Sequence, residues 1–345
     1  MSTSSTTQTK TIEGFAVIKQ GDKLTPYQYE EARLSPYGIE VEISHCGICH
    51  SDLHLITNDW GMTKYPLIPG HEIIGHVIQK GEQVKGFSIG DRIGIGWQRS
   101  SCHFCEFCHT GEENLCDKQE ATCVGHFGGF ANKILVDSRF AFHIPDGLAS
   151  ENAAPLLCGG ATVFSPLIQF NIQGTHKVGV VGIGGLGHLA IQFANAFGCE
   201  VTAFSSTPQK EQEAKEFGAH RFINSSDAKA FESAKSSLDL ILFTSSAMVD
   251  FDSYLSLLRP KGKLCILGAP KEGHVDVPIF SLLPFRKMVC SSAIASPHVI
   301  DEMLQFAALH NIVAKTEVFP MHEANLAIEK LSKNQIRYRA VLKNG

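Results

Sequence analysis

Apolar and polar positions alternate in short runs through the first part of the chain. Residues 12–45 contain such runs, as in GIEVEIS, and glycine or proline separates them. The segment 75–95, GHVIQKGEQVKGFSIGDRIGI, continues the pattern with glycines at its turns. Alternation with a period of two is typical of half-buried strands, so we expect a strand-rich first domain.

The pattern changes near residue 177. The apolar run KVGVVG predicts a buried strand, LGHLAIQFANAFG an amphipathic helix and EVTAFSS a second strand. A helix near 209–217 follows, and then strands at RFINS, LDLILFT and GKLCILG. Strands that alternate with helices predict a parallel, doubly wound α/β sheet. A last helix-rich stretch, 297–345, contains YRAVLKN, which we expect to be a strand that returns to the first domain.

These patterns divide the chain into three parts. We expect a first domain over residues 1–158, a dinucleotide-binding domain of the Rossmann type over 159–295, and a return segment over 296–345 that completes the first domain. The length of 345 residues fits two domains better than one core.

Composition narrows the functional classes. The net charge is −5, which disfavours nucleic acid as a partner, and no apolar run has the length of a membrane-spanning helix. The first ten residues, MSTSSTTQTK, lack the apolar core of a signal peptide and predict a disordered tail, so we expect a cytoplasmic enzyme. In a reducing compartment the eleven cysteines indicate metal binding or chemistry rather than disulfides.

Four cysteines lie close together within residues 99–117, in SCHFCEFCHTGEENLC. They are Cys102, Cys105, Cys108 and Cys116. Four thiolates complete the tetrahedral shell of Zn²⁺ and leave no position for substrate, which predicts a structural zinc site. An iron–sulfur cluster uses similar spacing, but the seven-residue gap before the last cysteine and the absence of proline after it favour zinc.

The run VVGIGGLGHLA places a glycine-rich turn between a predicted strand and a helix. This context is the one that a dinucleotide-binding turn requires, with the phosphates at the helix N-terminus. The candidate residues are Gly182, Gly184, Gly185, Leu186 and Gly187.

The next strand ends in AFSSTPQK, without the carboxylate that usually binds the ribose of NAD. The hydroxyl groups of Ser205, Ser206 and Thr207 can bind a 2′-phosphate, and Lys210 can neutralise it. We therefore expect NADP(H). The alternative is that Lys210 only begins a solvated helix face.

A catalytic zinc needs three protein ligands and an open position. The candidates are Cys46 or Cys49 in SHCGICHSDLH, His71 in PGHEIIGH and Cys158 in APLLCGGATVFSPL. From the residues alone, both members of the C-x-x-C pair remain possible ligands, and Cys158 is as well explained as a buried core residue.

The chain resembles zinc-dependent medium-chain alcohol dehydrogenases, and most closely their cinnamyl alcohol dehydrogenase branch. The matching stretches include GICHSDLH, YPLIPGHE, the four-cysteine segment, APLLCGGATVFSPL, GIGGLGH and NQIRYR, in the order of the family. The resemblance implies a GroES-like catalytic domain beside the Rossmann domain, two zinc ions per chain, and a homodimer joined through sheet edges such as residues 288–295.

The resemblance also assigns roles to single residues. It implies that Cys49, His71 and Cys158 bind the catalytic zinc, whereas Cys46 is a packing residue. Asp52 and Glu72 would lie near the metal, with Glu72 able to exchange onto it. Three further assignments concern the proton relay and the cofactor. Ser51 and His54 match the family's relay, Asp59 matches an additional relay position of the cinnamyl branch, and His50 is expected beside the cofactor pyrophosphate.

The expected reaction is reversible hydride transfer between NADPH and an aldehyde. We expect Trp60, Trp97 and Ile294 in the substrate pocket, since such walls suit aromatic or medium-chain aldehydes. Trp60 stands where the cinnamyl branch commonly has a smaller residue, so cinnamaldehyde itself is not implied.

Three alternatives remain at this point. A zinc-binding nucleic-acid module would need a basic surface, and a zinc-free quinone or enoyl reductase would lack the zinc ligands. An NAD-dependent primary-alcohol or polyol dehydrogenase shares the fold, but Ser205–Lys210 argues against it.

Overall fold

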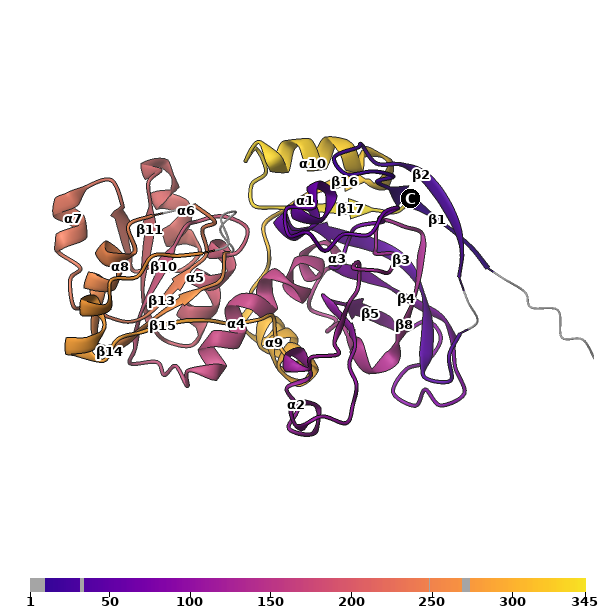
Figure 1. Cartoon of the computed structure of the whole chain (residues 1–345), viewed down its shortest axis with the longest axis horizontal. Coiled ribbons are helices and arrows are strands. Elements are labelled where there is room, and N and C mark those ends of the chain that lie inside the picture. The colour runs from indigo at the N-terminus through magenta and orange to yellow at the C-terminus, as the bar shows by residue number, and fades with distance from the viewer. Residues whose placement is uncertain (1–9, 32–33, 248, 269–273) are drawn as a thin grey trace, which may run out of the picture. The chain divides into compact units, whose positions relative to one another are not determined.

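A computed structural model describes residues 10–31, 34–247, 249–268 and 274–345, which form two compact units (Figure 1). The first unit comprises the chain up to Cys158, Ser296–Leu304 and Lys315–Gly345. The second comprises Gly159–Ala295 and Gln305–Ala314. The polar segment expected to be a disordered tail lies, apart from Lys10, outside the described residues.

The first unit is built mainly from strands. Its strands are β1 (Lys10–Ala16), β2 (Thr25–Glu31), β3 (Gly38–Ile48), β4 (Ile73–Lys80), β5 (Arg92–Ile95), β6 (Gln98–Ser100), β7 (Glu120–Ala121), β8 (Lys133–Asp137), β9 (Ala141–His143), β16 (Thr316–Pro320) and β17 (Arg339–Lys343). Its helices are α1 (His50–Thr57), α2 (Glu106–His109), α3 (Ser150–Ala153) and α10 (Ala324–Ser332). Within the described ranges its largest sheet has seven strands in the order β16-β17-β3-β4-β5-β9, with β8 also paired to β3.

Strand β3 is the centre of this sheet. Its first half pairs with β8, and residues 45–48 pair with β17. Strand β17 is the returning strand that the YRAVLKN pattern predicts. The alternating apolar side chains of β3, such as Ile39, Val41 and Ile43, are buried in the core of the unit. Because β3 ends at Ile48, this core fixes the position of the next residue, Cys49.

The second unit contains a parallel sheet. Its strands are β10 (Lys177–Val181), β11 (Glu200–Ser205), β12 (Arg221–Asn224), β13 (Leu238–Phe243), β14 (Leu258–Ile266) and β15 (Met288–Ser291). Its helices are α4 (Gly159–Gln169), α5 (Gly187–Ala196), α6 (Glu211–Glu216), α7 (Ala228–Glu232) and α8 (Phe251–Leu257).

The strand order, taken over the described residues, is β12-β11-β10-β13-β14-β15. This is the doubly wound Rossmann order, in which the direction of strand addition reverses beside the first strand, β10. The expected α/β fold class is confirmed: a Rossmann-type unit accompanies a strand-rich unit.

Helix α9 (Pro297–His310) is divided between the two units: its residues up to Leu304 belong to the first unit, and those from Gln305 belong to the second. Residues 305–314, which we expected in the return segment, group with the second unit. The reason is aromatic packing, because the Phe306 ring lies 5.5 Å from the ring of Phe164 and 4.9 Å from that of Phe197.

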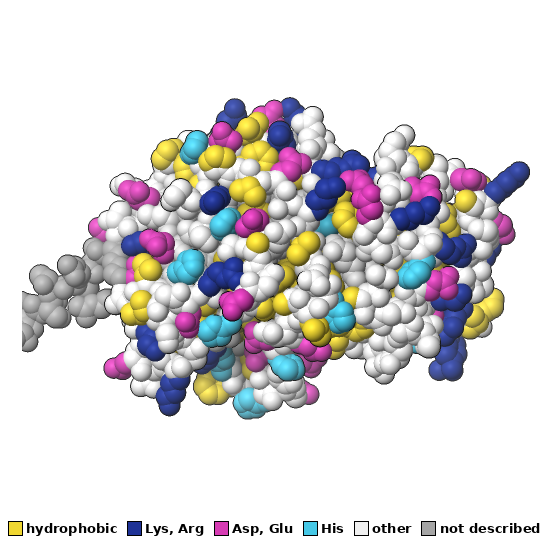
Figure 2. Space-filling model, turned by 180° about the vertical axis from the view of Figure 1, so that it is seen from behind, with side chains coloured by type: hydrophobic (Ala, Val, Ile, Leu, Met, Phe, Trp, Pro, Cys, Tyr) yellow, Lys and Arg dark blue, Asp and Glu magenta, His cyan; other side chains and the backbone are white. Residues whose placement is uncertain are grey.

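On the face drawn in Figure 2, basic and acidic side chains are interspersed among uncharged ones. None of the helices in the described ranges combines the length and apolar content needed to cross a membrane.

Candidate functional site: two sets of metal ligands and a dinucleotide turn

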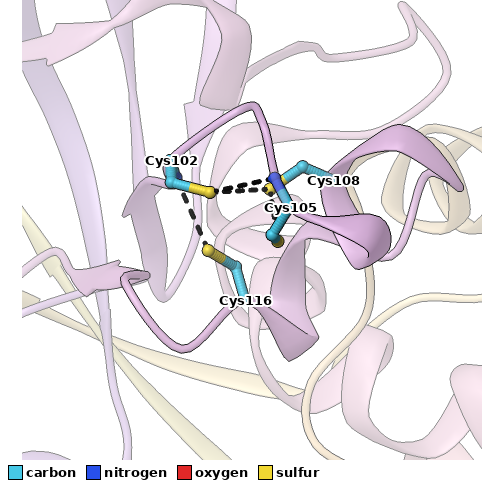
Figure 3. A group of neighbouring side chains, drawn as sticks. All are labelled: Cys102, Cys105, Cys108 and Cys116. Carbon is cyan, nitrogen blue, oxygen red and sulfur yellow. Dashed lines mark hydrogen bonds between the residues drawn. The ribbon is translucent and has the colours of Figure 1, made fainter.

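The four cysteines of the 99–117 segment converge on one point (Figure 3). The Sγ atoms of Cys102 and Cys108 are 3.9 Å apart, and those of Cys105 and Cys108 are 3.5 Å apart. Tetrahedral zinc with Zn–S bonds of about 2.3 Å separates its sulfur atoms by about 3.8 Å. Backbone N–H groups of Phe104 and Cys105 donate to Cys102 Sγ, and the first of these lowers the pKa of that thiol to about 6. The donor set therefore fits Zn²⁺.

Cys49 lies at the junction between β3 and α1, where it is the N-cap residue of the helix. The carboxylate of Asp52, in the first turn of α1, accepts a hydrogen bond from the Cys49 N–H at 2.9 Å. This reciprocal cap satisfies an amide that the helix itself cannot bond. It also fixes the thiol of Cys49 at the end of a buried strand.

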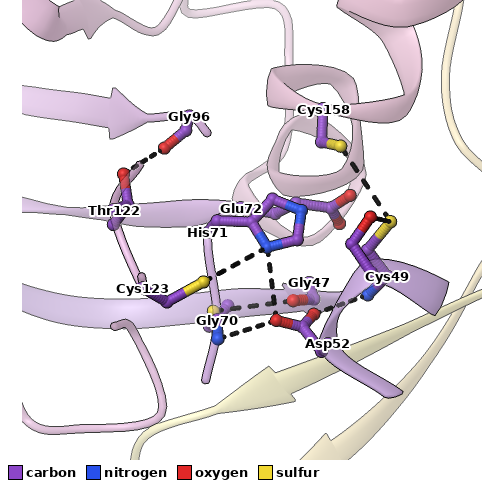
Figure 4. Close-up of polar contacts among 12 residues, drawn as sticks. Gly47, Cys49, Asp52, Gly70, His71, Glu72, Gly96, Thr122, Cys123 and Cys158 are labelled. Atoms are coloured by element: carbon purple, nitrogen blue, oxygen red, sulfur yellow. Dashed lines mark hydrogen bonds and ion pairs between the residues drawn. The ribbon is translucent and has the colours of Figure 1, made fainter. Parts of the chain in front are cut away.

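Asp52 orients the second candidate ligand, His71. Its Oδ1 atom lies 3.2 Å from His71 Nδ1 and accepts a hydrogen bond from the Gly70 N–H at 2.9 Å (Figure 4). A carboxylate accepts, so Nδ1 carries the proton and the lone pair of the neutral ring is on Nε2. His71 Nε2 is buried and has no hydrogen-bond partner within the described part of the chain. A histidine that binds a metal through one ring nitrogen commonly donates the N–H of the other to a carboxylate. His71 has this arrangement.

Cys158 and Glu72 complete this set with Cys49 and His71. One donor atom from each residue lies within 4.8 Å of all the others. The Cys49 and Cys158 Sγ atoms are 4.0 Å apart, and Glu72 Oε2 is buried without a partner among the described residues. The hydrogen bond between the thiols holds the pKa of Cys49 well below and that of Cys158 well above the ordinary value. Two sulfur atoms, one imidazole nitrogen and one carboxylate oxygen are all donors that zinc accepts.

Arg339 was not predicted as part of the site. It is buried at the start of β17, and its guanidinium pairs with Glu72 Oε1. Burial lowers the Arg339 pKa, but the neighbouring Glu72 carboxylate raises it by a larger amount. The net pKa lies above the ordinary value, so the residue remains a cation. Burial raises the pKa of Glu72 to about 7 against the opposing effect of Arg339. A Cβ at Gly47 would overlap Glu72 Oε2, so a glycine is required for this close approach.

The structure separates the two cysteines of the C-x-x-C pair. Cys46 is fully buried in the core, with its Sγ against the backbone of Gly70 and Gly129, and it is absent from the ligand group. Cys123, which sequence reasoning did not select, lies with its Sγ 3.9 Å from His71 Nδ1. The Cys123 thiol has its pKa raised by burial.

The predicted relay residues lie along α1 and just after it. Ser51 Oγ is 3.6 Å from Cys49 Sγ, and His54 Nδ1 is 2.8 Å from Asp59 Oδ2. The Trp60 ring lies over His54 at 5.0 Å with a 30° tilt. The structure thus brings His54, Asp59 and Trp60 together and places Ser51 at the metal set.

The predicted pocket residues are found in different surroundings. Trp97 meets His71 edge to face at 4.9 Å, whereas Trp60 is exposed beside His54. Ile294 belongs to the second unit. His50 is exposed in the first turn of α1, and its expected contact with the cofactor stays a prediction.

The glycine-rich turn joins β10 to α5 at the reversal point of the sheet. Gly182 has a φ of 88°, a left-handed conformation that favours glycine, and a Cβ at Gly187 would overlap the carbonyl oxygen of Gly182. A Cβ at Gly184 would meet no atom within 4 Å, so this side of the turn is open. Helix α5 has no side-chain cap at its N-terminus. The accessible backbone N–H groups at the start of a helix without a side-chain cap can bind a phosphate group.

The residues after β11 lie where the adenosine ribose is expected. Ser205 ends the strand, Ser206 and Thr207 are exposed, and Lys210 Nζ donates to the carbonyl oxygen of Ile183 at 2.6 Å. The amine of Lys210 therefore lies beside the glycine-rich turn, although 27 residues separate it from Ile183.

Comparisons with known proteins agree with this arrangement. Residues 35–146 match the alcohol dehydrogenase GroES-like domain, and residues 185–308 match the zinc-binding dehydrogenase domain. An aldehyde reductase from Synechocystis sp. is 41% identical over 96% of this chain and 98% of its own length.

Two solved structures share the fold over nearly the whole chain. A cinnamyl alcohol dehydrogenase from Sorghum bicolor superposes with a TM-score of 0.93 at 38% identity, covering 97% of this chain and 98% of its own. A cinnamyl alcohol dehydrogenase from Helicobacter pylori, solved with NADP(H), gives 0.91 at 31% identity, covering 97% and 99%. The family resemblance expected from the motifs is confirmed. The chain belongs to the zinc-binding medium-chain alcohol dehydrogenases, close to their cinnamyl alcohol dehydrogenase branch.

Proposed function

We propose that this protein is a zinc-dependent, NADP(H)-linked alcohol dehydrogenase and aldehyde reductase. The observation that carries the proposal is the buried group of Cys49, His71, Glu72 and Cys158, in which His71 Nε2 and Glu72 Oε2 have no partner within the described residues. Zinc held there would supply Lewis acidity to a carbonyl or hydroxyl oxygen, and nicotinamide would supply or accept the hydride.

The protein's own residues hold and tune this centre. With zinc bound, Cys49 and Cys158 would be thiolates that supply negative charge, and Asp52 keeps the His71 ring in the tautomer that presents Nε2. Glu72 can interact with two cations, because Oε1 is paired with Arg339 and Oε2 faces the proposed zinc position. Arg339 can hold the carboxylate back so that one coordination position is left for substrate.

His54 is the proposed proton carrier. His54 Nδ1 is hydrogen-bonded to the Asp59 carboxylate, which fixes the orientation of the ring. The Trp60 ring covers one face of His54 and limits its rotation. Ser51, beside Cys49, is the proposed first acceptor of the alcohol proton.

We assign NADP(H) as the preferred cofactor over NAD(H). Support comes from the hydroxyl groups and the lysine after β11, from the lack of a carboxylate there, and from the NADP(H) complex of the Helicobacter pylori relative. For the substrate we propose aromatic or medium-chain aldehydes, because Trp60 and Trp97 flank the relay and the metal set respectively.

We also propose a homodimer in the cytoplasm. In the described part of the sheet β15 is an edge strand, and the adjoining segment exposes Phe280 by 80% and Leu283 by 62%. A second copy paired along this edge would cover both side chains. Cytoplasmic location is supported by the eleven cysteines, which a reducing compartment keeps as free thiols for metal binding. Light scattering on the purified chain would test the dimer.

The proposal is tested by a matched pair of variants, Cys49→Ser and Cys46→Ala. We expect Cys49→Ser to lose one of two zinc ions per chain and nearly all NADPH-dependent aldehyde reduction, because one metal ligand is removed. Cys46→Ala should keep both zinc ions, since this thiol lies in the core outside the ligand group. Unchanged zinc content in folded Cys49→Ser would contradict the ligand assignment.

The cofactor assignment needs a separate measurement. A panel of aldehydes assayed with NADPH and NADH should give a higher kcat/KM with NADPH throughout. Equal values for the two cofactors would refute the NADP assignment and favour the NAD-dependent alternative. Zinc bound only at the four cysteines of the 99–117 segment in the native protein would favour a reductase without a catalytic zinc.

A further inference from the structure

His188 is a buried histidine at the second position of α5, directly after the glycine-rich turn. Its Nδ1 atom lies 3.0 Å from the carbonyl oxygen of Gly184. A carbonyl oxygen can only accept, so Nδ1 is the protonated nitrogen and donates. The backbone N–H of His188 donates to the same oxygen at 3.1 Å. The Gly184 carbonyl is therefore held by two donors from one residue.

The preceding carbonyl is held from another element. Lys210 Nζ donates to the carbonyl oxygen of Ile183 at 2.6 Å. Two consecutive peptide groups of the turn, 183–184 and 184–185, are thus each anchored through their oxygen by a side chain.

A trans peptide group points its N–H opposite to its C=O. Anchoring the oxygens of Ile183 and Gly184 therefore turns the N–H groups of Gly184 and Gly185 away from the anchors. Neither amide has a hydrogen-bond partner among the described residues. A Cβ added at Gly184 would have no other atom within 4 Å, so there is room for a ligand on this side of the turn. Outward N–H groups at a helix start are donors for a phosphate oxygen.

We propose that His188 is a positioning residue for the pyrophosphate of the dinucleotide cofactor. Its imidazole keeps the Gly184–Gly185 peptide in the orientation that presents the Gly185 N–H to the phosphate. The inference rests on the proposed function, in that the ligand of this turn is taken to be NADP(H). It adds a residue that lies behind the turn and does not itself contact the cofactor.

The surroundings of His188 hold its ring in place. The Phe217 ring packs against the imidazole at 5.5 Å with a 62° tilt. The side chain of Gln192, one turn further along α5, donates to the His188 carbonyl oxygen at 3.1 Å.

Three substitutions separate the hydrogen bond from simple packing. His188→Asn places an amide nitrogen near the position of Nδ1, His188→Gln places it near that of Nε2, and His188→Leu fills the space without a donor. The readout is the Kd of the zinc-loaded protein for NADPH and for NADH, from quenching of protein fluorescence. A thermal unfolding curve without cofactor verifies that each variant is folded.

We expect His188→Leu and His188→Gln to bind both cofactors roughly three- to tenfold more weakly, since one neutral hydrogen bond is lost. His188→Asn should restore most of the affinity. The NADPH-to-NADH ratio should stay unchanged in all three, because both cofactors carry the same pyrophosphate. Weakened binding in folded His188→Asn equal to that in His188→Leu would overturn the inference, as would a change confined to NADPH. Wild-type protein that binds neither cofactor would instead refute the proposed function.

Discussion

Asp52→Asn is the substitution that most directly tests how the metal set is held. The Asp52 carboxylate is fully buried and accepts three hydrogen bonds. Oδ1 accepts from His71 Nδ1 and from the Gly70 N–H, and Oδ2 accepts from the Cys49 N–H. Two of these three donors belong to proposed zinc ligands.

The size of the effect follows from these contacts. Asparagine keeps one acceptor oxygen, so its NH₂ group must face at least one N–H donor whichever way the amide is turned. One charge-assisted hydrogen bond is lost, which costs about 1.5–3 kcal/mol, or roughly a 10- to 150-fold change in an equilibrium constant. Removing the hydrogen-bond acceptor of a metal-bound histidine typically lowers the metal affinity of a site by about 10- to 100-fold, which is the same range. We therefore expect zinc binding at this set to weaken about 30-fold.

The assay is zinc retained per chain after dialysis against a graded series of chelator concentrations, followed by aldehyde reduction with NADPH. The zinc held by Cys49, His71 and Cys158 should leave Asp52→Asn at an about 30-fold lower chelator concentration than in the wild type. The zinc of the 99–117 segment should leave at the same concentration in both proteins. Asp239→Asn is the matched control, because that carboxylate is only 9% exposed and accepts from the Lys177 N–H at 2.8 Å in the second unit. If Asp52→Asn retained both zinc ions as firmly as Asp239→Asn, the carboxylate would not be positioning the ligands.

Three further predictions address other parts of the chain. Lys210→Met should lower kcat/KM for NADPH at least about tenfold relative to NADH, because the cation available to the 2′-phosphate is lost; an unchanged ratio would show that Lys210 only supports the turn through Ile183. Cys116→Ser should lose the zinc of the 99–117 segment and lower the Tm while the Cys49 set keeps its zinc, as metal analysis and thermal unfolding would show; an unaltered Tm would mean that this zinc does not stabilise the fold. Burial alone would raise the pKa of Asp137, but hydrogen bonds from Arg139 lower it below the ordinary value. The stability it adds is therefore present above its unfolded pKa of about 4 and is lost as pH falls; urea titrations should show a shallower acid decline for Asp137→Asn, and parallel curves would contradict the assignment.

Local patterns were sufficient for the parts of the molecule that depend on neighbouring residues. The four cysteines of 102–116 are brought together by a short loop, and the turn at 182–187 follows from its strand, its glycines and its helix. Alternation of apolar residues predicted β3, and the apolar run at 177 predicted β10. In each case the physical cause acts within about 15 residues.

Contacts between distant residues were beyond such reasoning. Glu72 and Arg339 are 267 positions apart, and nothing near either residue indicates its partner. A signal was nevertheless present, because Arg339 is a charged residue directly before the apolar run Ala340–Leu342 of β17. Cys123 is similar, since long-range hydrogen bonds of the preceding residue hold it near His71: the Thr122 N–H donates to the Trp97 carbonyl at 2.7 Å and the Thr122 hydroxyl to the Gly96 carbonyl at 2.6 Å. The choice of Cys49 over Cys46 came from family resemblance, and the structure agrees with it because the Cys49 thiol, and not that of Cys46, lies in the group with His71, Glu72 and Cys158.

Strand β17 has a consequence for the order in which this protein can mature. It pairs with β3 and delivers Arg339 to Glu72, yet it is synthesised some 180 residues after Cys158. A nascent chain that has only reached Cys158 already contains Cys49, His71 and Cys158, but its Glu72 carboxylate lacks the guanidinium of Arg339. Leaving a buried carboxylate unpaired is costly. In chain order the second unit lies within the first, so the Arg339–Glu72 pair can form only after the second unit has been synthesised.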